Sequence, residues 1–235
     1  MNVNEFIAYL KELNIDINEE QLLKFEKYTS LLQEYNKKFN LTSITKTEDI
    51  YLKHFYDSLC LFKIKALFNT YTLLDIGTGA GFPGIPLAII NPNLKVTLVE
   101  SNNKKCGFLN IVKEKLNLQN VEIINTRAEV YAQNNKEKYD IVTSRAVSHL
   151  KILSEVESPT LKINGYFLPL KSHIQEELEE SKDILNKLNL KLENIINYTL
   201  PIESSNRTIL VIKKVDKTPE IYPRSYNKIL KELKG

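Results

Sequence analysis

The stretch Leu74-Asp75-Ile76-Gly77-Thr78-Gly79-Ala80-Gly81-Phe82-Pro83-Gly84 decides the fold class, because a short apolar run leads directly into closely spaced glycines. The run Thr72–Ile76 predicts a buried strand. The glycines let the backbone turn tightly and approach a ligand with no Cβ in the way. Pro83 suits the first turn of a helix, because its missing N–H costs little there. Ligands bind at the carboxyl ends of strands in open α/β sheets, so this loop is predicted to bind one.

Strand and helix patterns alternate along the chain after this loop. Further short apolar runs predict strands at Lys95–Glu100, Val121–Ile124, Tyr139–Thr143, Gly165–Leu168 and Thr208–Ile212. A helical pattern follows the second strand, and another spans Ile174–Leu190. This alternation predicts an α/β fold with a mostly parallel sheet that helices cover on both faces.

Residues 1–66 contain no glycine and no proline and have a helical pattern. Apolar residues recur every three or four positions, which predicts one face of a helix, at Leu22, Phe25, Tyr28, Leu32, Tyr35 and Phe39. Asn40–Ser43 is predicted to end that helix. Thr47 is predicted to cap a second helix that runs to Phe62. The region therefore reads as a compact helical cap.

Composition places the chain among globular proteins of the cytoplasm. Its 235 residues are 43% hydrophobic and 26% charged, and no apolar run is long enough for a membrane span. The start of the sequence has no basic segment before an apolar one, which argues against a secretory signal. Cys60 and Cys106 lie far apart, so we expect neither a disulfide framework nor a zinc site.

The net charge of +3 is unevenly distributed. Residues 1–65 hold nine Lys and Arg against ten Asp and Glu, whereas residues 201–235 hold eight against four. A basic C-terminal end is compatible with contact to phosphates, and a solvated tail is the alternative.

Two cofactor classes compete for the glycine loop. Gly79, Gly81 and Gly84 form a G-x-G-x-x-G pattern, which would place the pyrophosphate of a dinucleotide at a helix N-terminus. Asp75 argues against that, because its carboxylate would repel a pyrophosphate and better matches the cationic methionine end of S-adenosylmethionine. Glu100, 25 residues later, fits hydrogen bonds to ribose hydroxyls in either class, or a helix cap.

The carboxyl ends of two other predicted strands carry further candidates. Ala128 and Glu129 follow the third strand, where the loop of such a sheet lies beside an adenine. Arg145 follows the fourth strand, and its guanidinium there suits a phosphate, a cofactor carboxylate or a base edge. A surface ion pair is the alternative for Arg145.

His54, His149 and Lys171 are weaker candidates. His54 with Asp57 also fits a helix-face hydrogen bond that serves only packing. No metal site is predicted.

Asp75–Pro86, with Arg127-Ala128-Glu129 and Ser144-Arg145-Ala146, resembles the bacterial small-subunit ribosomal RNA guanine-N7 methyltransferases, formerly called glucose-inhibited division protein B. Asn40-Leu41-Thr42 and His54–Leu59 look like the helical-cap motifs of that family. The similarity runs from about residue 15 to residue 212, so it leaves residues 213–235 without a counterpart.

The resemblance implies a class I S-adenosylmethionine-dependent methyltransferase fold, Rossmann-like, with an N-terminal helical extension. We accordingly expect a cap at 1–66, a methyltransferase domain at 67–215 and a basic C-terminal tail at 216–235. It also implies S-adenosyl-L-methionine as the donor and guanine 527, in the decoding-region loop of 16S rRNA, as the acceptor. By position it assigns cofactor contacts to Gly77, Phe82, Ala128, Glu129 and Arg145. The wider fold adds Asp75, Gly79 and Glu100.

Guanine N7 has a free lone pair, so such an enzyme needs alignment of the reactants rather than a strong base. We expect Arg145 to be the catalytic residue. The expected partner is 16S ribosomal RNA or the small ribosomal subunit, with no membrane and a monomeric enzyme. A small-molecule methyltransferase of the same fold, an NAD-dependent oxidoreductase and a non-catalytic RNA-binding protein are the alternatives.

Overall fold

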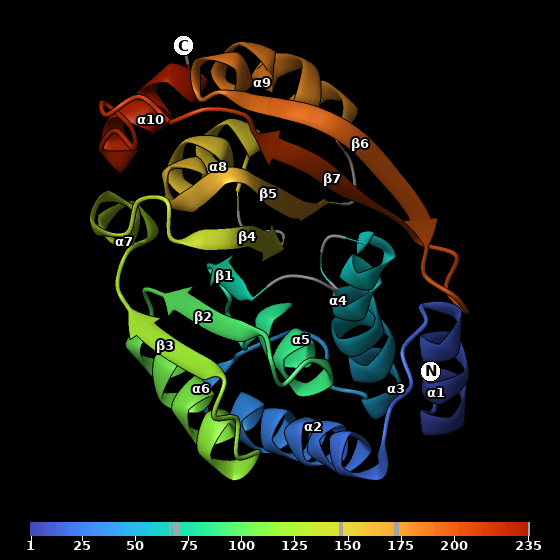
Figure 1. The fold of residues 1–235 in the computed structure, drawn as a ribbon. Helices are drawn as coiled ribbons and strands as arrows, with labels where there is room; N and C mark the ends of the chain where they lie inside the picture. Colours follow the sequence, from blue (N-terminus) through green and yellow to red (C-terminus); the bar gives the residue numbers. More distant parts are fainter. Residues whose placement is uncertain (66, 68–70, 146–147, 172–173, 235) are drawn as a thin grey trace.

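A seven-stranded sheet forms the centre of the protein in the computed structural model, which describes residues 1–65, 67, 71–145, 148–171 and 174–234 (Figure 1). The strand order is β3-β2-β1-β4-β5-β7-β6. The strands are β1 (Thr72–Ile76), β2 (Lys95–Glu100), β3 (Val121–Asn125), β4 (Tyr139–Arg145), β5 (Leu161–Lys171), β6 (Leu190–Thr199) and β7 (Asn206–Lys214). All neighbours pair in parallel except β7, which is antiparallel to both β5 and β6. The mostly parallel sheet predicted from the sequence is confirmed.

Strand β6 was not predicted from the sequence, and its own residues explain why. The predicted helix Ile174–Leu190 is confirmed as α9 (Gln175–Lys187), but its last residues are not helical. Asn189 takes a left-handed conformation with φ 56°, which ends the helix, and Leu190 then begins β6. Since β6 is an edge strand with many exposed polar positions, its sequence lacks the apolar run of a buried strand.

Alternate residues of the central strands enter different hydrophobic clusters, as the pleat of a strand requires. Leu73 and Leu98 pack with the cap helices and with α5 (Gly84–Ile90) and α6 (Asn103–Lys115). Leu74 and Val99 pack on the other face, with α7 (Ala128–Asn134), α8 (Leu150–Glu157) and α9. The predicted two-faced burial is therefore present.

The N-terminal cap consists of α1 (Val3–Glu12), α2 (Glu19–Phe39), α3 (Thr47–Asp49), the π-helix η1 (Ile50–Tyr56), α4 (Asp57–Leu59) and the 3-10 helix η2 (Cys60–Lys63). The predicted end of α2 is confirmed, because Asn40 adopts a left-handed conformation with φ 49°. The prediction that Thr47 caps the second helix was wrong by one residue. Lys46 occupies the cap position without a side-chain hydrogen bond, and Thr47 is already helical.

Two more local details differ from the sequence analysis. Pro83 lies at the N-cap position of α5, one residue before the predicted first turn. The C-terminal segment contains a helix, α10 (Tyr226–Lys234), which packs on α8. The side chain of Ile229 is only 3% exposed, against Ile152 and Val156. This part of the segment is packed rather than solvated.

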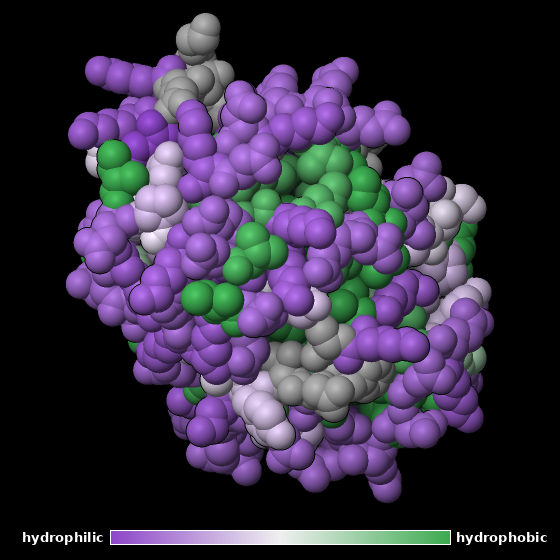
Figure 2. Space-filling model, turned by 45° about the horizontal axis from the view of Figure 1, so that its top comes forward, coloured by the Kyte–Doolittle hydropathy of each residue, from purple (hydrophilic) through white to green (hydrophobic). Residues whose placement is uncertain are grey.

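The surface is mostly hydrophilic on the face that Figure 2 presents, and hydrophobic side chains gather there in one hollowed area. Within the described ranges, we find no helix that combines the length and the apolar character of a membrane span.

Candidate active site

A pocket of about 240 Å³ opens at the carboxyl ends of β1, β2 and β3. Four of the predicted cofactor residues line it: Gly77, Glu100, Ala128 and Glu129. Gly77 follows β1, Glu100 ends β2, and Ala128 and Glu129 begin α7 after β3, so the parallel sheet brings all four to one edge, where open α/β sheets bind their ligands. The other predicted residues, Asp75, Gly79, Phe82 and Arg145, are not among those that line this pocket.

The glycine loop has the backbone conformation that glycine permits. Gly77, in the pocket wall, has φ 66°, and its N–H donates to the carbonyl of Val99 at 2.9 Å. Gly81 has φ 105°, and a Cβ there would lie 2.6 Å from the hydroxyl oxygen of Tyr28. That hydroxyl donates to the carbonyl of Ala80. Tyr28 of the cap therefore holds the loop from beneath, a role that its place on the apolar face of α2 did not reveal.

The side chain of Glu100 holds the glycine loop through a hydrogen bond and also lines the pocket. Its Oε2 accepts from the N–H of Gly79 at 3.0 Å, and its Oε1 accepts from the N–H of Asn102 at 2.8 Å. A carboxylate has about four acceptor positions, so two remain for a ligand. Asn102 is the residue that caps α6, so the helix-cap alternative for Glu100 was wrong.

Asp75 lies beneath the same loop, fully buried. Its Oδ2 accepts from the hydroxyl of Thr78 at 2.6 Å and from the N–H of Gly84 at 2.8 Å. Its Oδ1 has no hydrogen-bond partner among the described residues. Burial raises the pKa of this carboxyl to about 7. A buried carboxylate oxygen without a partner is costly, and a cationic ligand end would satisfy it. These residues therefore fit S-adenosylmethionine.

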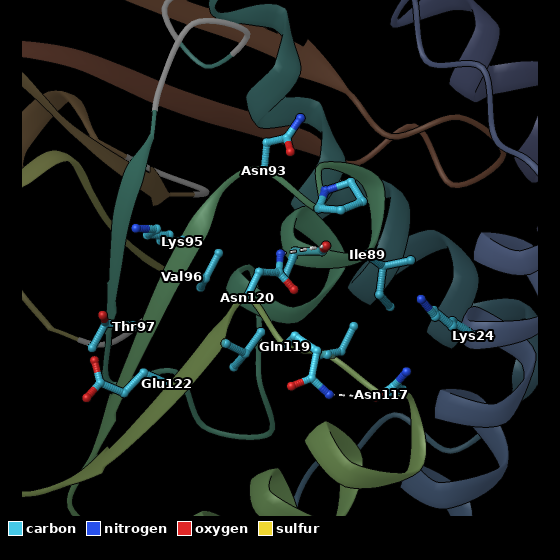
Figure 3. Close-up of a pocket in the computed structure, with 14 residues that line it drawn as sticks. Lys24, Ile89, Asn93, Lys95, Val96, Thr97, Asn117, Gln119, Asn120 and Glu122 are labelled. Atoms are coloured by element: carbon cyan, nitrogen blue, oxygen red, sulfur yellow. Dashed lines mark hydrogen bonds between the residues drawn. The ribbon is translucent and has the colours of Figure 1, made fainter.

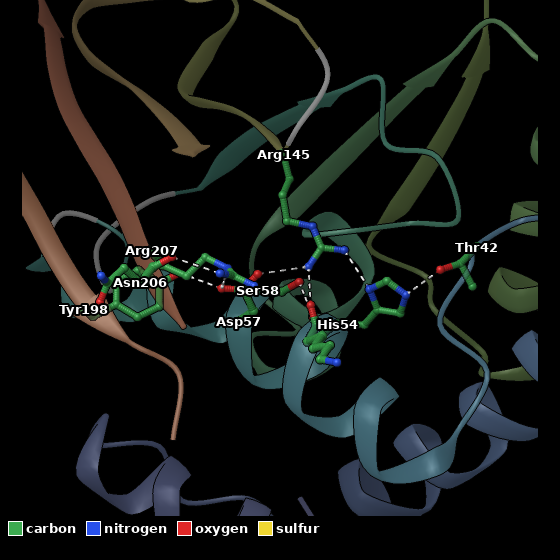
Figure 4. A network of polar contacts seen from close by, with 9 residues as sticks. Thr42, His54, Asp57, Ser58, Arg145, Tyr198, Asn206 and Arg207 are labelled. Atoms are coloured by element: carbon green, nitrogen blue, oxygen red, sulfur yellow. Dashed lines mark hydrogen bonds and ion pairs between the residues drawn. The ribbon is translucent and has the colours of Figure 1, made fainter. Parts of the chain in front are cut away.

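Arg145 ends β4 and binds the cap (Figure 4). Its Nη1 donates to the carbonyl of Lys53 at 2.8 Å and lies 3.4 Å from Oδ2 of Asp57. Its Nη2 donates to Nδ1 of His54 at 2.9 Å, and its guanidinium carbon lies 5.1 Å from the ring centre of Phe82. The side chain is 15% exposed, so the ion pair that was the alternative for Arg145 is present, with Asp57, but it is partly buried rather than at the surface.

His54 is a neutral link in this network. Because Nδ1 accepts from Arg145, Nε2 carries the proton and donates to the hydroxyl of Thr42 at 3.0 Å. Burial, followed by the charge of Arg145, lowers the pKa of His54 to about 3. The ring stacks on Phe82 with centroids 4.3 Å apart. The helix-face bond between His54 and Asp57 was a wrong prediction, because both residues instead contact Arg145.

Asp57 extends the network to residues of β6 and β7. Its Oδ1 accepts from the hydroxyl of Tyr198 at 2.7 Å and lies 3.7 Å from Nε of Arg207 (Figure 4). Lys53, His54 and Tyr56 belong to the π-helix η1, a rare geometry that is frequent at functional sites. The cap motifs noted in the sequence thus meet Arg145 and Phe82 in space. Ala146 of the third motif lies outside the described residues.

The weaker candidates have structural partners. His149 caps α8 through a 3.3 Å bond to the N–H of Lys151, and its Nε2 lies 3.1 Å from Glu180. Lys171 pairs with Glu177 at 2.8 Å. Cys60 and Cys106 are free and buried. Across the part of the chain that the structure describes, no cluster of three or more His, Cys, Asp or Glu could hold a metal.

A second pocket, of about 660 Å³, lies at the opposite edge of the sheet (Figure 3). It is lined by residues at the amino ends of β2 and β3, among them Lys95 and Glu122. The side-chain amide of Asn120 donates there to the carbonyls of Ala88 and Leu94 and so joins neighbouring loops. Since parallel sheets bind ligands at the carboxyl edge, the smaller pocket is the candidate site.

Comparison with known proteins agrees with this geometry. The family described as rRNA small subunit methyltransferase G matches residues 21–205 of this chain. The ribosomal RNA small subunit methyltransferase G of Lysinibacillus sphaericus is 44% identical over 227 residues, which is 95% of both chains. The protein of that name in Bacillus subtilis is 45% identical over the same length and shares.

Solved structures support the fold. A methyltransferase from Aquifex aeolicus, described as SAM-dependent, superposes with a TM-score of 0.51 and 17% identity, covering 75% of this chain and 97% of its own. The predicted class I methyltransferase fold is confirmed, and a dinucleotide-dependent oxidoreductase is not favoured.

The neutral state of His54 predicts a pH dependence of stability. Between its unfolded pKa of about 6.5 and its folded value of about 3, only the unfolded chain binds the proton. The stability that depends on neutral His54 is therefore complete above pH ~6.5 and is lost as the pH falls. His54→Gln keeps an acceptor for Arg145 and a donor for Thr42, without the titration.

Urea unfolding of both proteins at several pH values measures the effect. The free energy of unfolding of the wild type, relative to that of His54→Gln, should fall by roughly 1.4 kcal/mol per unit from pH ~6 to pH ~4. The raised pKa of Asp75 acts in the opposite direction in both proteins and cancels in the difference. Parallel pH profiles would show that folding does not shift the pKa of His54, and would contradict its neutral, buried role.

Proposed function

Because this chain belongs to the rRNA small subunit methyltransferase G family, and is thus an S-adenosylmethionine-dependent rRNA methyltransferase, we propose that it methylates N7 of a guanine in 16S rRNA. The observation that carries the proposal is the pocket at the carboxyl edge of the sheet, with Arg145 fixed at the end of the neighbouring strand. The substrate is 16S rRNA or the small ribosomal subunit, and the enzyme acts as a monomer in the cytoplasm.

The pocket takes the adenosyl end of the cofactor. The two free acceptor positions of Glu100 face the ribose hydroxyls, and Ala128 and Glu129, at the start of α7, contact the adenine. Gly77 lets the backbone approach the ligand closely, because no side chain fills the space. When bound, the cofactor supplies a methyl group that its sulfonium charge makes electrophilic.

The other predicted residues lie, in this proposal, toward the methionine end of the cofactor. Asp75 lies buried beneath the loop with Oδ1 unpartnered, so its charge would favour a cationic cofactor end bound above the loop without direct contact. Gly79, Phe82 and Arg145 lie along the same loop and at the next strand end, so they border the side where the acceptor base enters.

N7 of guanine is an acceptor that this site can serve without a general base. The lone pair of N7 is available at neutral pH, so alignment of the two reactants is the main task. His54, the nearest histidine in the network, has a pKa of about 3 and hydrogen bonds at both ring nitrogens, so it does not abstract a proton. Arg145 is the proposed catalytic residue, acting as a positioned charge next to the reacting groups.

The rest of the chain supports RNA binding in this proposal. Residues 1–66 form the cap, residues 67–215 the methyltransferase domain, and residues 216–235 the basic C-terminal segment. The RNA surface is built from the cap, the rim of the catalytic domain and this segment. Binding should weaken as salt rises, because Lys and Arg release counterions from the phosphates that they contact.

The substrate assignment predicts a specific chemical mark. Incubation with 16S rRNA from cells that lack the enzyme should place one methyl group on guanine N7. Reduction followed by aniline treatment cleaves RNA at N7-methylguanosine, so primer extension should then stop at one site. Label that appears on another atom or another RNA would refute the assignment.

Glu100→Ala should weaken binding of S-adenosylhomocysteine about ten- to a hundredfold, the range for loss of roughly 1.5–3 kcal/mol of hydrogen bonds to a charged group. The loss includes the acceptors for the N–H groups of Gly79 and Asn102. Calorimetric titration measures it, with Glu122→Ala as the control, because Glu122 is exposed and lies outside this pocket. Equal affinity of Glu100→Ala and wild type would remove Glu100 from the site.

Arg145→Ala should reduce kcat at least tenfold, and Arg145→Lys should restore little of it. An ammonium cannot reach the carbonyl of Lys53, the ring of His54 and the carboxylate of Asp57 together, as the planar guanidinium does. Single-turnover methyl transfer at saturating cofactor measures the effect, and thermal unfolding shows whether each variant is folded. Full activity of a folded Arg145→Lys protein would contradict the role.

A further inference from the structure

One wall of the cofactor pocket comes from the C-terminal segment. Tyr226, the first residue of α10, lines this pocket together with Glu100, Ala128 and Glu129. The family model matches residues 21–205, so this wall lies beyond the part of the chain that the model covers. None of the site residues predicted from the sequence lies in this segment.

Helix α10 packs beside α8 (Figure 1), and its first residue, Tyr226, is the one that lines the pocket. Tyr226, Ile229 and Leu230 have the spacing of one helical face. Ile229 forms a buried cluster with Ile152 and Val156 of α8, and Tyr226 and Leu230 pack against this cluster. Ile229 is 3% exposed, so this face is anchored in the core. The ring of Tyr226 lies at the end of the face that borders the pocket.

An ion pair fixes the start of α10. Arg224 donates to Oε1 of Glu155 from its backbone N–H at 2.8 Å and from Nε at 2.9 Å, and to Oε2 from Nη2 at 2.7 Å. The side chain of Glu155 is 1% exposed, so its charge depends on this partner. Because Arg224 precedes Tyr226 by two residues, the clamp holds the tyrosine at the pocket.

The neighbours of Tyr226 identify the part of the ligand that it meets. Ala128, the proposed adenine contact, packs against the same small cluster as Tyr226. The residues proposed for the methionine end, Asp75 and Arg145, are not among those that line the pocket. We propose that Tyr226 is a cofactor-binding residue whose ring packs against the adenine. The inference rests on the proposed placement of the cofactor.

Binding would be strengthened by stacking of the planar tyrosine ring on the planar adenine base. Tyr226 is half-buried in the structure, so its remaining exposed surface can be covered by a ligand. Loss of stacking between an aromatic side chain and a base weakens binding roughly five- to a hundredfold. A side chain that is apolar but not flat would keep the packing of α10 and lose this stacking.

Calorimetric titration of the full chain with S-adenosylhomocysteine and with 5′-methylthioadenosine tests the proposal. Tyr226→Ala and Tyr226→Leu should bind both ligands about tenfold more weakly, by the same factor, because both ligands carry the adenosyl group. Tyr226→Phe should bind within about threefold of the wild type, since the ring remains. Leucine preserves the apolar contact with α8, so Tyr226→Leu remains informative if the alanine variant unfolds.

Tyr71→Leu is the matched control, because Tyr71 is 73% exposed and lies outside the pocket. Wild-type affinity in Tyr226→Leu, or tighter binding, would overturn the inference and leave the proposed function intact. A loss for S-adenosylhomocysteine alone would place the ring at the amino-acid end and also overturn it. A wild type that binds neither ligand would instead refute the proposed function.

Discussion

The buried guanidinium of Arg145 is the interaction on which the arrangement of the site depends. A charge that is 15% exposed must find hydrogen bonds within the protein to replace those of water. The guanidinium finds its acceptors in one stretch of the cap. They are the carbonyl of Lys53, Nδ1 of His54 and the carboxylate of Asp57. Since Arg145 ends the central strand β4, this single side chain fixes the cap to the functional edge of the sheet. A shift of the cap would leave a charge without partners.

The same cap residues also shape the glycine loop. The ring of Phe82 stacks between His54, at 4.3 Å, and Tyr28, at 5.4 Å. Tyr28 additionally donates to the carbonyl of Ala80 and occupies the space that a side chain at Gly81 would need. Contacts within the protein therefore fix the conformation of the loop. Preorganisation of this kind lowers the entropy lost on binding.

The sequence predicted the fold well, because its signals are local. Apolar runs, glycines and helical spacing predicted every strand except β6, whose edge position leaves it polar, and the ends of elements shifted by a few residues. The pocket brings together Gly77, Glu100, Ala128 and Glu129, as strand order alone requires. The partners of Arg145 and the wall formed by Tyr226 could not be predicted, since they join segments about 90 residues apart or more. Contacts between segments so far apart leave no signal in the local sequence of either segment.

The two carboxylates of the site explain why loop shape and ligand binding cannot be separated in this protein. Oε2 of Glu100 accepts from Gly79, and Oδ2 of Asp75 accepts from Thr78 and Gly84, so each acid holds the loop with one side. Asp75 keeps a second oxygen without a partner among the described residues, and Glu100 lines the pocket. The loop thus lies between an acid that lines the pocket and an acid buried beneath it. Any movement of the loop therefore disturbs the hydrogen bonds of both acids, so the shape of the pocket and the charges around it change together.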